Sequence, residues 1–284
     1  NAFVMTESLT SIEFPDSLVR IGNYAFSPYS NGYGGSYIEY TTSNLENIKF
    51  GSGIKTIGKQ AFYKNEKLKS IDLTGSNLTL IDTGAFQNCI SLIEINLSGN
   101  NLVIESSAFY DDKYLKNVTF GAGIKSIGSN AFYNCLSISE LNFFDGLDRI
   151  YSDAFRNCKS ISLVTLPNTL SSIGNSAFYN CERITSVHIP DKVTEIQGGC
   201  FTNCHLLKKV TIGSGCTSIS PTAFTGANSI EEIIVEEDNK KYTSVDGVLY
   251  NNDKTTLVLY PKGRRGNFTI PDAVTTIAER AFER

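Results

Sequence analysis

Histidine is nearly absent from this sequence: its 284 residues include two, His188 and His205. Two histidines that far apart along the chain give no nucleophile–base pair, and the G-x-S-x-G motif of many hydrolases is missing as well. The sequence contains no catalytic constellation that we recognise. We therefore expect a protein without enzymatic activity.

Long hydrophobic runs and an excess of positive charge are also missing. No apolar stretch approaches the length of a membrane span, so we expect no insertion into a bilayer. Lys and Arg together number 25 and Asp and Glu 29, for a formal net charge of −4. This balance gives no general attraction to nucleic acid or acidic membranes, and we expect no nucleic-acid partner.

What the sequence does contain is a repeated unit, seen most clearly from Phe155 to Phe178. Ile161, Val164 and Leu166 end in apolar–polar alternation, which is typical of a half-buried strand. Pro167 then removes a backbone donor and stops the strand. The following Leu-x-x-Ile predicts a second short extended or turning segment, and the Asn-Ser-Ala-Phe that ends the unit suits a tight helical turn.

The phenylalanine that begins each unit, called the anchor Phe below, returns at a nearly constant spacing of 23 residues along most of the chain. A fixed period of this size predicts a solenoid, in which each repeat buries its apolar edge against its neighbours. Both ends of the sequence fall inside a repeat, so we expect one array over 1–284, truncated at both ends. The anchors are Phe3, Phe26, Phe62, Phe86, Phe109, Phe132, Phe155, Phe178, Phe201, Phe224 and Phe282.

The repeat resembles the BspA-type leucine-rich-repeat family of bacterial and protist surface proteins. Residues 186–196 and 173–181 match its pattern L-x-x-I-x-I-P-x-x-V-x-x-I-G-x-x-A-F-x-x-C nearly verbatim, and 92–102 fits the ordinary leucine-rich-repeat consensus. The resemblance implies an α/β fold: a curved leucine-rich-repeat solenoid that is mostly β, with a parallel sheet of roughly eleven strands and short helical turns.

For function, the resemblance implies a secreted, non-enzymatic binding module at the cell surface. Its role would be adhesion, with a protein or glycan on another cell or in the extracellular matrix as the partner. The alternative is a structural spacer that displays another domain. Because repeat scaffolds serve many partners, the fold alone does not decide between these functions. No cofactor or metal is expected.

Two stretches interrupt the period. Residues 27–44 contain an insertion rich in Gly, Ser and Tyr, which suits a surface loop or small hairpin. Residues 236–268 form a long repeat with two alternating runs around a polar Asn-Asp turn, which predicts a β-hairpin. Since the insertion contributes nothing to stacking, its tyrosines are candidates for partner binding: Tyr29, Tyr33, Tyr37 and Tyr40.

The exposed face of the predicted strands is a second candidate surface. His188 occupies an exposed strand position, with Thr165 and Thr211 as expected neighbours, and we include it among the partner-binding candidates. The other charges of this face are expected to pair across repeats, which would leave a solvated, self-neutralised face. The expected pairs are Glu46 with Lys69, Lys49 with Asp72, Lys208 with Glu231 and Lys209 with Glu232.

The remaining candidates have simpler structural explanations. The seven cysteines fall on core positions of the repeat, so we expect free, buried thiols. Gly53 to Lys59 nearly spells a phosphate-binding P-loop, and Cys200, Cys204 and His205 suggest zinc, but repeat positions account for these residues. Asparagines that recur two residues after the anchor Phe should bond neighbouring turn backbones. Tyrosines that directly follow it form either packing on the turns or an aromatic stripe, and residues 262–265 are a weak candidate for a polyanion site.

Overall fold

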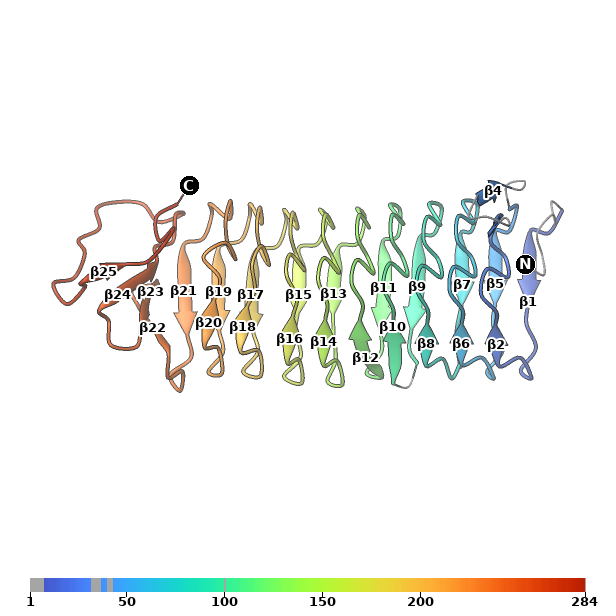
Figure 1. The fold of residues 1–284 in the computed structure, drawn as a ribbon, viewed down its shortest axis with the longest axis horizontal. Helices are drawn as coiled ribbons and strands as arrows, with labels where there is room; N and C mark the ends of the chain where they lie inside the picture. The colour runs from blue at the N-terminus through green and yellow to red at the C-terminus, as the bar shows by residue number, and fades with distance from the viewer. Residues whose placement is uncertain (1–7, 32–36, 40–42, 100, 284) are drawn as a thin grey trace.

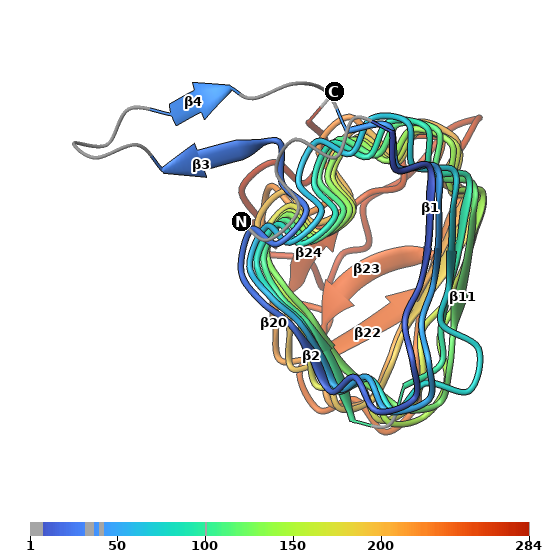
Figure 2. The same ribbon diagram turned by 90° about the vertical axis from the view of Figure 1, so that its right-hand side faces the viewer.

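Successive repeats stack as the turns of a solenoid. The computed structural model describes residues 8–31, 37–39, 43–99 and 101–283. Figure 1 shows the turns side by side along the long axis. Figure 2, viewed along that axis, shows two sides of the cross-section built from strands and a third region built from the turns between them. We call one turn of the solenoid a rung.

Each regular rung contributes one strand to each of two parallel rows, row A and row B, rather than to the single sheet that the sequence predicted. The last strand of row A, β21, has no counterpart in row B. The Leu-x-x-Ile segment of the repeat supplies row B, which therefore consists of strands and not only of turns. Row A contains β1 (Ser11–Glu13), β5 (Asn47–Lys49), β7 (Ser70–Asp72), β9 (Glu94–Leu97), β11 (Asn117–Phe120), β13 (Glu140–Asn142), β15 (Leu163–Thr165), β17 (Ser186–Ile189), β19 (Lys209–Ile212) and β21 (Glu232–Val235). Row B contains β2 (Arg20–Ile21), β6 (Thr56–Ile57), β8 (Leu80–Ile81), β10 (Leu102–Ile104), β12 (Ile124–Ile127), β14 (Arg149–Ile150), β16 (Ser172–Ile173), β18 (Glu195–Ile196) and β20 (Ser218–Ile219).

The pairing keeps equivalent repeat positions side by side. Val187 of β17 pairs with Val210 of β19, and Val210 pairs with Ile233 of β21. A shift by one residue would turn every apolar side chain of a strand to the solvent, so the repeated pattern selects this register.

The predicted leucine-rich-repeat solenoid is confirmed, but the described turns that carry the anchor Phe are not the short helical turns that were expected with it. None of the described residues forms a helix, and hence none of the described segments is a helix able to cross a membrane. The residue two positions after the anchor Phe adopts a left-handed backbone, with φ of 59° at Asn134 and 63° at Asn157. A left-handed residue cannot continue a right-handed helix, and Asn tolerates this conformation better than most residues.

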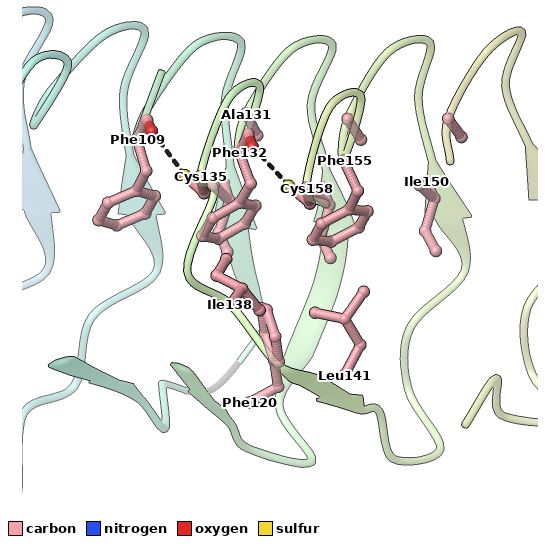
Figure 3. Packing of buried hydrophobic residues seen from close by; sticks show 14 of the residues in the cluster. Phe109, Phe120, Ala131, Phe132, Cys135, Ile138, Leu141, Ile150, Phe155 and Cys158 are labelled. Atoms are coloured by element: carbon pink, nitrogen blue, oxygen red, sulfur yellow. Dashed lines mark hydrogen bonds between the residues drawn. The ribbon is translucent and has the colours of Figure 1, made fainter. Parts of the chain in front are cut away.

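The anchor Phe side chains form one continuous stack through the core. From Phe26 to Phe224, successive ring centroids lie 4.9–5.7 Å apart with nearly parallel planes. Figure 3 shows Phe109, Phe132 and Phe155 in this arrangement. Each ring is buried, so the stack joins the rungs from Phe26 to Phe224 into one core, and a second, smaller core cluster lies in the C-terminal sheet.

The insertion at 27–44 does not disturb the stacking. It contains two short antiparallel strands, β3 (Tyr29–Asn31) and β4 (Tyr37–Glu39), which we call the arm. Figure 2 shows that the arm extends away from the solenoid. Beneath it, Ile12 of β1 still pairs with Ile48 of β5, so the extra residues leave the array and the chain returns in register.

The long repeat at 236–268 holds most of a small sheet at the C-terminal end of the array. Strands β22 (Tyr242–Val245), β23 (Val248–Asn251) and β24 (Thr256–Leu259) are antiparallel, and β25 (Thr276–Ile277) runs parallel to β24. The polar Asn-Asp turn noted in the sequence joins β23 to β24. Tyr260 takes the place of an anchor Phe, because its N–H donates to the carbonyl of Ala281 (2.9 Å) as anchor residues do elsewhere.

Candidate partner-binding surfaces

Row A presents a solvent-exposed face on which charged side chains pair across rungs. The Nζ of Lys69 lies 2.8 Å from Glu46, that of Lys208 lies 3.1 Å from Glu231, and that of Lys209 lies 3.2 Å from Glu232. These three pairs were predicted. Such exposed pairs contribute about 0–1 kcal/mol each, so they neutralise the face more than they stabilise the fold.

The fourth predicted pair is wrong. Lys49 bonds to Glu13 on the preceding rung, not to Asp72 on the following one. The carboxylate of Asp72 instead accepts the N–H of Thr74 (2.9 Å), and this bond together with the side chain of Thr74 lowers the pKa of Asp72. A strand residue has a neighbour on each side, and its partner depends on which carboxylate the local turn has already engaged.

His188 lies on this face, as expected from its place in the repeat. It pairs with Thr211 of β19, and its side chain is 58% exposed. Its Nε2 lies 3.5 Å from Oε1 of Glu236, so the histidine adds a polar edge beside an acidic residue. An exposed imidazole beside Glu236, with the carboxylate of Asp191 close enough to interact with it electrostatically, is suited to contact a partner.

Beside His188, row A is interrupted. Strands β15 and β17 are not hydrogen-bonded to each other, although each pairs with the strand on its other side. A hollow of about 260 Å³ opens at this break, lined by Thr165, Asn168, Ser186 and His188 among others. Thr165, the second expected neighbour of His188, thus lies across the hollow from it rather than in a continuous sheet.

The four candidate tyrosines of the insertion fall on the arm and its surroundings. The backbones of Tyr29 and Tyr37 lie in β3 and β4, where Asn31 pairs with Tyr37 and Tyr29 pairs with Glu39. Tyr33 and Tyr40 lie outside the described residues. The arm and His188 occupy different rungs, near the first and the eighth strands of row A, so the structure does not bring these candidates into one site.

On the turns, the recurring asparagines form a ladder of side chains. Asn134 donates from Nδ2 to Oδ1 of Asp111 (2.7 Å), and each later asparagine donates to the one before it at 2.8 Å. Their structural role was predicted, but the partners are neighbouring side chains rather than turn backbones. The ladder consists of Asp111, Asn134, Asn157, Asn180 and Asn203.

The tyrosines next to the anchors pack on one another. The rings of Tyr110 and Tyr133 stack at 4.8 Å, and the guanidinium of Arg156 lies 4.2 Å from the ring of Tyr179. The same guanidinium also forms an ion pair, with Nη1 of Arg156 3.0 Å from Oδ1 of Asp153. Because the ring faces are already used within this column, we interpret it as packing over the turns and not as a sugar-binding platform.

The thiols lie in the core, and all seven cysteines are free and buried. Five of them donate from Sγ to the carbonyl of the anchor Phe of the preceding rung, as Cys135 does to Phe109 (3.1 Å) and Cys158 to Phe132 (3.0 Å) in Figure 3. Burial raises the pKa of both thiols, which makes them unreactive.

In one rung, the position three residues after the anchor Phe holds a carboxyl in place of a thiol. Asp112 is fully buried, its Oδ1 accepts the N–H of Cys89 (2.7 Å), and its Oδ2 has no partner among the described residues. Burial raises the pKa of Asp112 well above its usual value, which favours the protonated carboxyl over a wider range of pH. The sequence reasoning missed it, although an Asp at a position that neighbouring rungs give to Cys was visible.

The P-loop-like and zinc-like motifs do not assemble sites. Ile54 and Ile57 are buried core residues, and Ile57 lies in β6 of row B. A Cβ on Gly53 would meet the carbonyl oxygen of Asp16 at 1.9 Å, so that glycine allows the two rungs to pack closely. Cys204 bonds to a core carbonyl, whereas His205 is exposed and its Nδ1 lies 3.1 Å from the carbonyl of Gly226. Within the described ranges, no group of three or more metal-ligating side chains converges.

Fold and surface together define a β-solenoid with leucine-rich repeats. The family model for the BspA type leucine rich repeat region matches residues 1–32, 35–162 and 125–255 with 6 copies, and the chain belongs to this family. The resemblance noted from the repeat pattern is therefore confirmed. No curated protein matches the chain.

One solved structure supports the same fold, and a second is similar to a lesser degree. A leucine rich cell surface protein from Faecalibacterium prausnitzii is similar over 95% of this chain and 78% of its own, with 18% identity and a TM-score of 0.52. A leucine-rich repeat protein from Bacteroides ovatus is similar over 76% of each chain, with 19% identity and a TM-score of 0.48. At such identities the likeness concerns the fold alone.

Proposed function

We propose that this protein is a non-enzymatic, surface-exposed binding module that adheres to a protein or glycan on another cell or in the extracellular matrix. The arm makes the primary contact. The observation that carries this proposal is that β3 and β4 extend away from the solenoid while the rungs beneath them remain paired. A segment that contributes nothing to stacking is available for recognition.

The composition of the insertion supports a contact surface. Tyrosine supplies a large contact area with few rotatable bonds, and it is enriched at the residues that dominate interface energies. The direction of the arm favours presentation of these residues over the alternative in which the insertion folds back to shield the first rungs. The cell-surface description of the F. prausnitzii protein supports an extracellular location for this chain.

The test is to delete 29–40 and join the ends with a short Gly-Ser link. Binding of the parent and deleted chains is measured against arrays of matrix proteins and glycans, together with the melting temperature. We expect loss of binding with an unchanged melting temperature. A lower melting temperature indicates that the insertion is a shield, and unchanged binding excludes the arm as the contact.

His188→Gln is a matched variant on the other candidate surface. It removes the titratable imidazole and keeps a polar side chain beside Glu236. If the arm is the contact, this variant binds as the parent does. If instead His188→Gln weakens binding and the arm deletion does not, the partner uses the hollow between β15 and β17.

A structural spacer is the second candidate function, and the row A face favours it. Three cross-rung ion pairs neutralise the face, which leaves little charge to attract a partner there. A spacer binds nothing in the arrays, with or without the arm. Its function would then be to hold another domain at a fixed distance.

A further inference from the structure

A cavity lies where the regular array meets the C-terminal sheet. Its volume is about 90 Å³ and its walls are mostly apolar, with Ile219, Phe224, Ile230, Leu259 and Tyr260 among the lining residues. It is partly open to solvent, and Lys262, Arg280 and Glu283 also line it. This site is separate from the arm and from His188, and the proposed function does not use it.

The cavity exists because two rungs separate here. In regular turns, the N–H of the anchor Phe donates to the next rung, as Phe201 does to the carbonyl of Ala223 (2.8 Å), and the N–H two residues later does the same. The equivalent amides of Phe224 and Gly226 donate to no backbone carbonyl in the described part of the chain. Row B breaks at the same place, since β20 and β24 belong to different sheets.

A side chain of this turn is also left without a partner. Oγ1 of Thr225 is buried and has no hydrogen-bond partner among the described residues, and Thr225 lines the cavity. At the same position one rung earlier, Oγ1 of Thr202 donates to the carbonyl of Thr222 at 3.0 Å. Leaving a buried polar group unpaired is unfavourable, so a hydroxyl and an amide with no acceptor among the described residues identify a place where a ligand can supply one.

Two cations and two carboxylates line the opening, and one of the two cations contacts neither carboxylate. Arg280 lies 3.6 Å from Glu279 and 3.4 Å from Glu283, so it is paired with both carboxylates. Lys262 has no ion pair or hydrogen bond within the described residues. Burial lowers the pKa of Lys262, while Glu283 acts in the opposite direction. A partly buried ammonium without a contacting carboxylate is stabilised by an anion.

We propose that this cavity binds a small carboxylate with a branched aliphatic body. The body fills the apolar space between Phe224 and Tyr260. The carboxylate accepts hydrogen bonds from the Phe224 amide and the Thr225 hydroxyl and pairs with Lys262. Both a free branched-chain acid and the C-terminal residue of an apolar peptide present this chemistry.

The experiment uses methyl NMR on the full chain. Isovalerate is titrated while the resonances of Ile219, Ile230 and Leu259 are followed, with Ile127 in the middle of row B as the reference. We expect saturable shifts at the three cavity residues and none at Ile127. Isovaleramide has the same shape without the charge, and it should bind at least about tenfold more weakly, because a charge-assisted hydrogen bond is lost.

Two matched pairs of variants assign the contacts. Thr225→Val keeps the shape and removes the unpaired hydroxyl, so it should weaken isovalerate binding without lowering the melting temperature, whereas Thr202→Val should leave binding unchanged. Lys262→Met should reduce the preference for isovalerate over isovaleramide, and Lys240→Met, at an exposed site, should not. N-acetyl-leucine and its amide distinguish the sources: binding of N-acetyl-leucine with the same dependence on Lys262 indicates a peptide C-terminus, and its failure indicates free acids.

The proposal is overturned if isovalerate gives no saturable shift at the cavity residues. It is also overturned if isovaleramide binds as well as isovalerate, or if Thr225→Val and Lys262→Met both bind as the parent does. None of these results tests the proposed role of the arm, which is measured separately by binding to the arrays of matrix proteins and glycans.

Discussion

Phe155 shows at the scale of one residue how the array is held together. Its ring centroid lies 5.3 Å from that of Phe132 and 5.6 Å from that of Phe178, and the side chain is fully buried. A side chain in this position contributes to three rungs at once. Its removal leaves a cavity that neither neighbour can fill without moving its own ring.

Phe155→Ala is therefore expected to cost about 3–5 kcal/mol in the free energy of unfolding, measured by urea denaturation. Phe282→Ala is the control, because Phe282 is 43% exposed and its ring stacks on Tyr260 only at the end of the array. The control should lose much less. Equal losses would contradict a continuous stacked core. Phe3, the first anchor in the sequence, lies outside the described residues.

Asp112 is the residue whose effect depends on pH. The variant Asp112→Asn keeps the shape of the side chain, and Asn65 shows that Asn fits this slot, since its Nδ2 donates to the carbonyl of Phe26 at 3.0 Å. We expect the variant to be more stable than the parent at neutral pH. An amide makes the same hydrogen bonds without a group that favours the unfolded state when ionised.

The stability of Asp112→Asn relative to the parent should increase with pH, because the parent becomes less stable as pH rises. Below the ordinary Asp pKa of about 3.9, both states hold the proton and the two chains differ least. Above it, the unfolded chain loses the proton that folded Asp112 retains, so the parent loses about 1.4 kcal/mol per pH unit until its raised folded pKa is reached. Urea midpoints over a pH series measure the difference. The stability of Asp238→Asn, at an exposed site, should change with pH as that of the parent does. The same result for Asp112→Asn would contradict a raised pKa of Asp112 in the folded state.

At the scale of an element, the asparagine ladder combines two functions in one side chain. Asn157 has a φ of 63°, and it both donates to Asn134 and accepts from Asn180 at 2.8 Å. Its backbone conformation forms the turn, and its amide joins three successive rungs. These two contributions can be separated by substitution.

Asn157→Gly removes the amide and keeps the left-handed backbone, whereas Asn157→Ala removes the amide and adds the cost of a Cβ in this conformation. We expect Ala to be the more destabilising by about 1 kcal/mol, because the left-handed penalty of about 1–2 kcal/mol is partly offset by the greater freedom of unfolded glycine. Thermal unfolding of the two variants provides the comparison. Equal stability would show that only the amide contributes.

At the scale of the whole molecule, each rung contacts only its neighbours, so unfolding can begin at a weak boundary and spread. One such boundary follows β20, where row B has no further strand of the regular array. Cys216 belongs to this last regular rung, and Cys158 lies in the middle of the array. The buried thiols thus report where the array opens.

Native protein should show almost no reaction with a thiol reagent, and seven thiols should react after full denaturation. In intermediate urea, Cys216 should react before Cys158, which mass spectrometry of labelled peptides can show. Uniform labelling of all seven would indicate a single cooperative unit. Early labelling of Cys158 would contradict opening from the C-terminal boundary.

Much of the architecture follows from the sequence alone, because every rung repeats the same local information. The spacing of the anchor Phe predicts the solenoid, the alternation around Val164 predicts the strands of row A, and the core positions of the cysteines predict free thiols. Adjacent rungs present equivalent residues to each other, so one well-interpreted repeat describes its neighbours. The Tyr-rich insertion was likewise recognisable as a surface segment, although its tyrosines and His188 remain predictions as binding residues.

Only the tertiary structure determines the contacts between rungs, because a local sequence pattern does not specify them. Whether Lys49 pairs with Glu13 or Asp72 depends on the neighbours on both sides, and the breaks beside β17 and β20 depend on how separate rungs meet. The cavity at Thr225 arises because Tyr260, which is 36 residues after Phe224, takes the next anchor position after an intervening hairpin. Such features are set by the distances between rungs in space, and a repeat pattern specifies only the sequence within each rung.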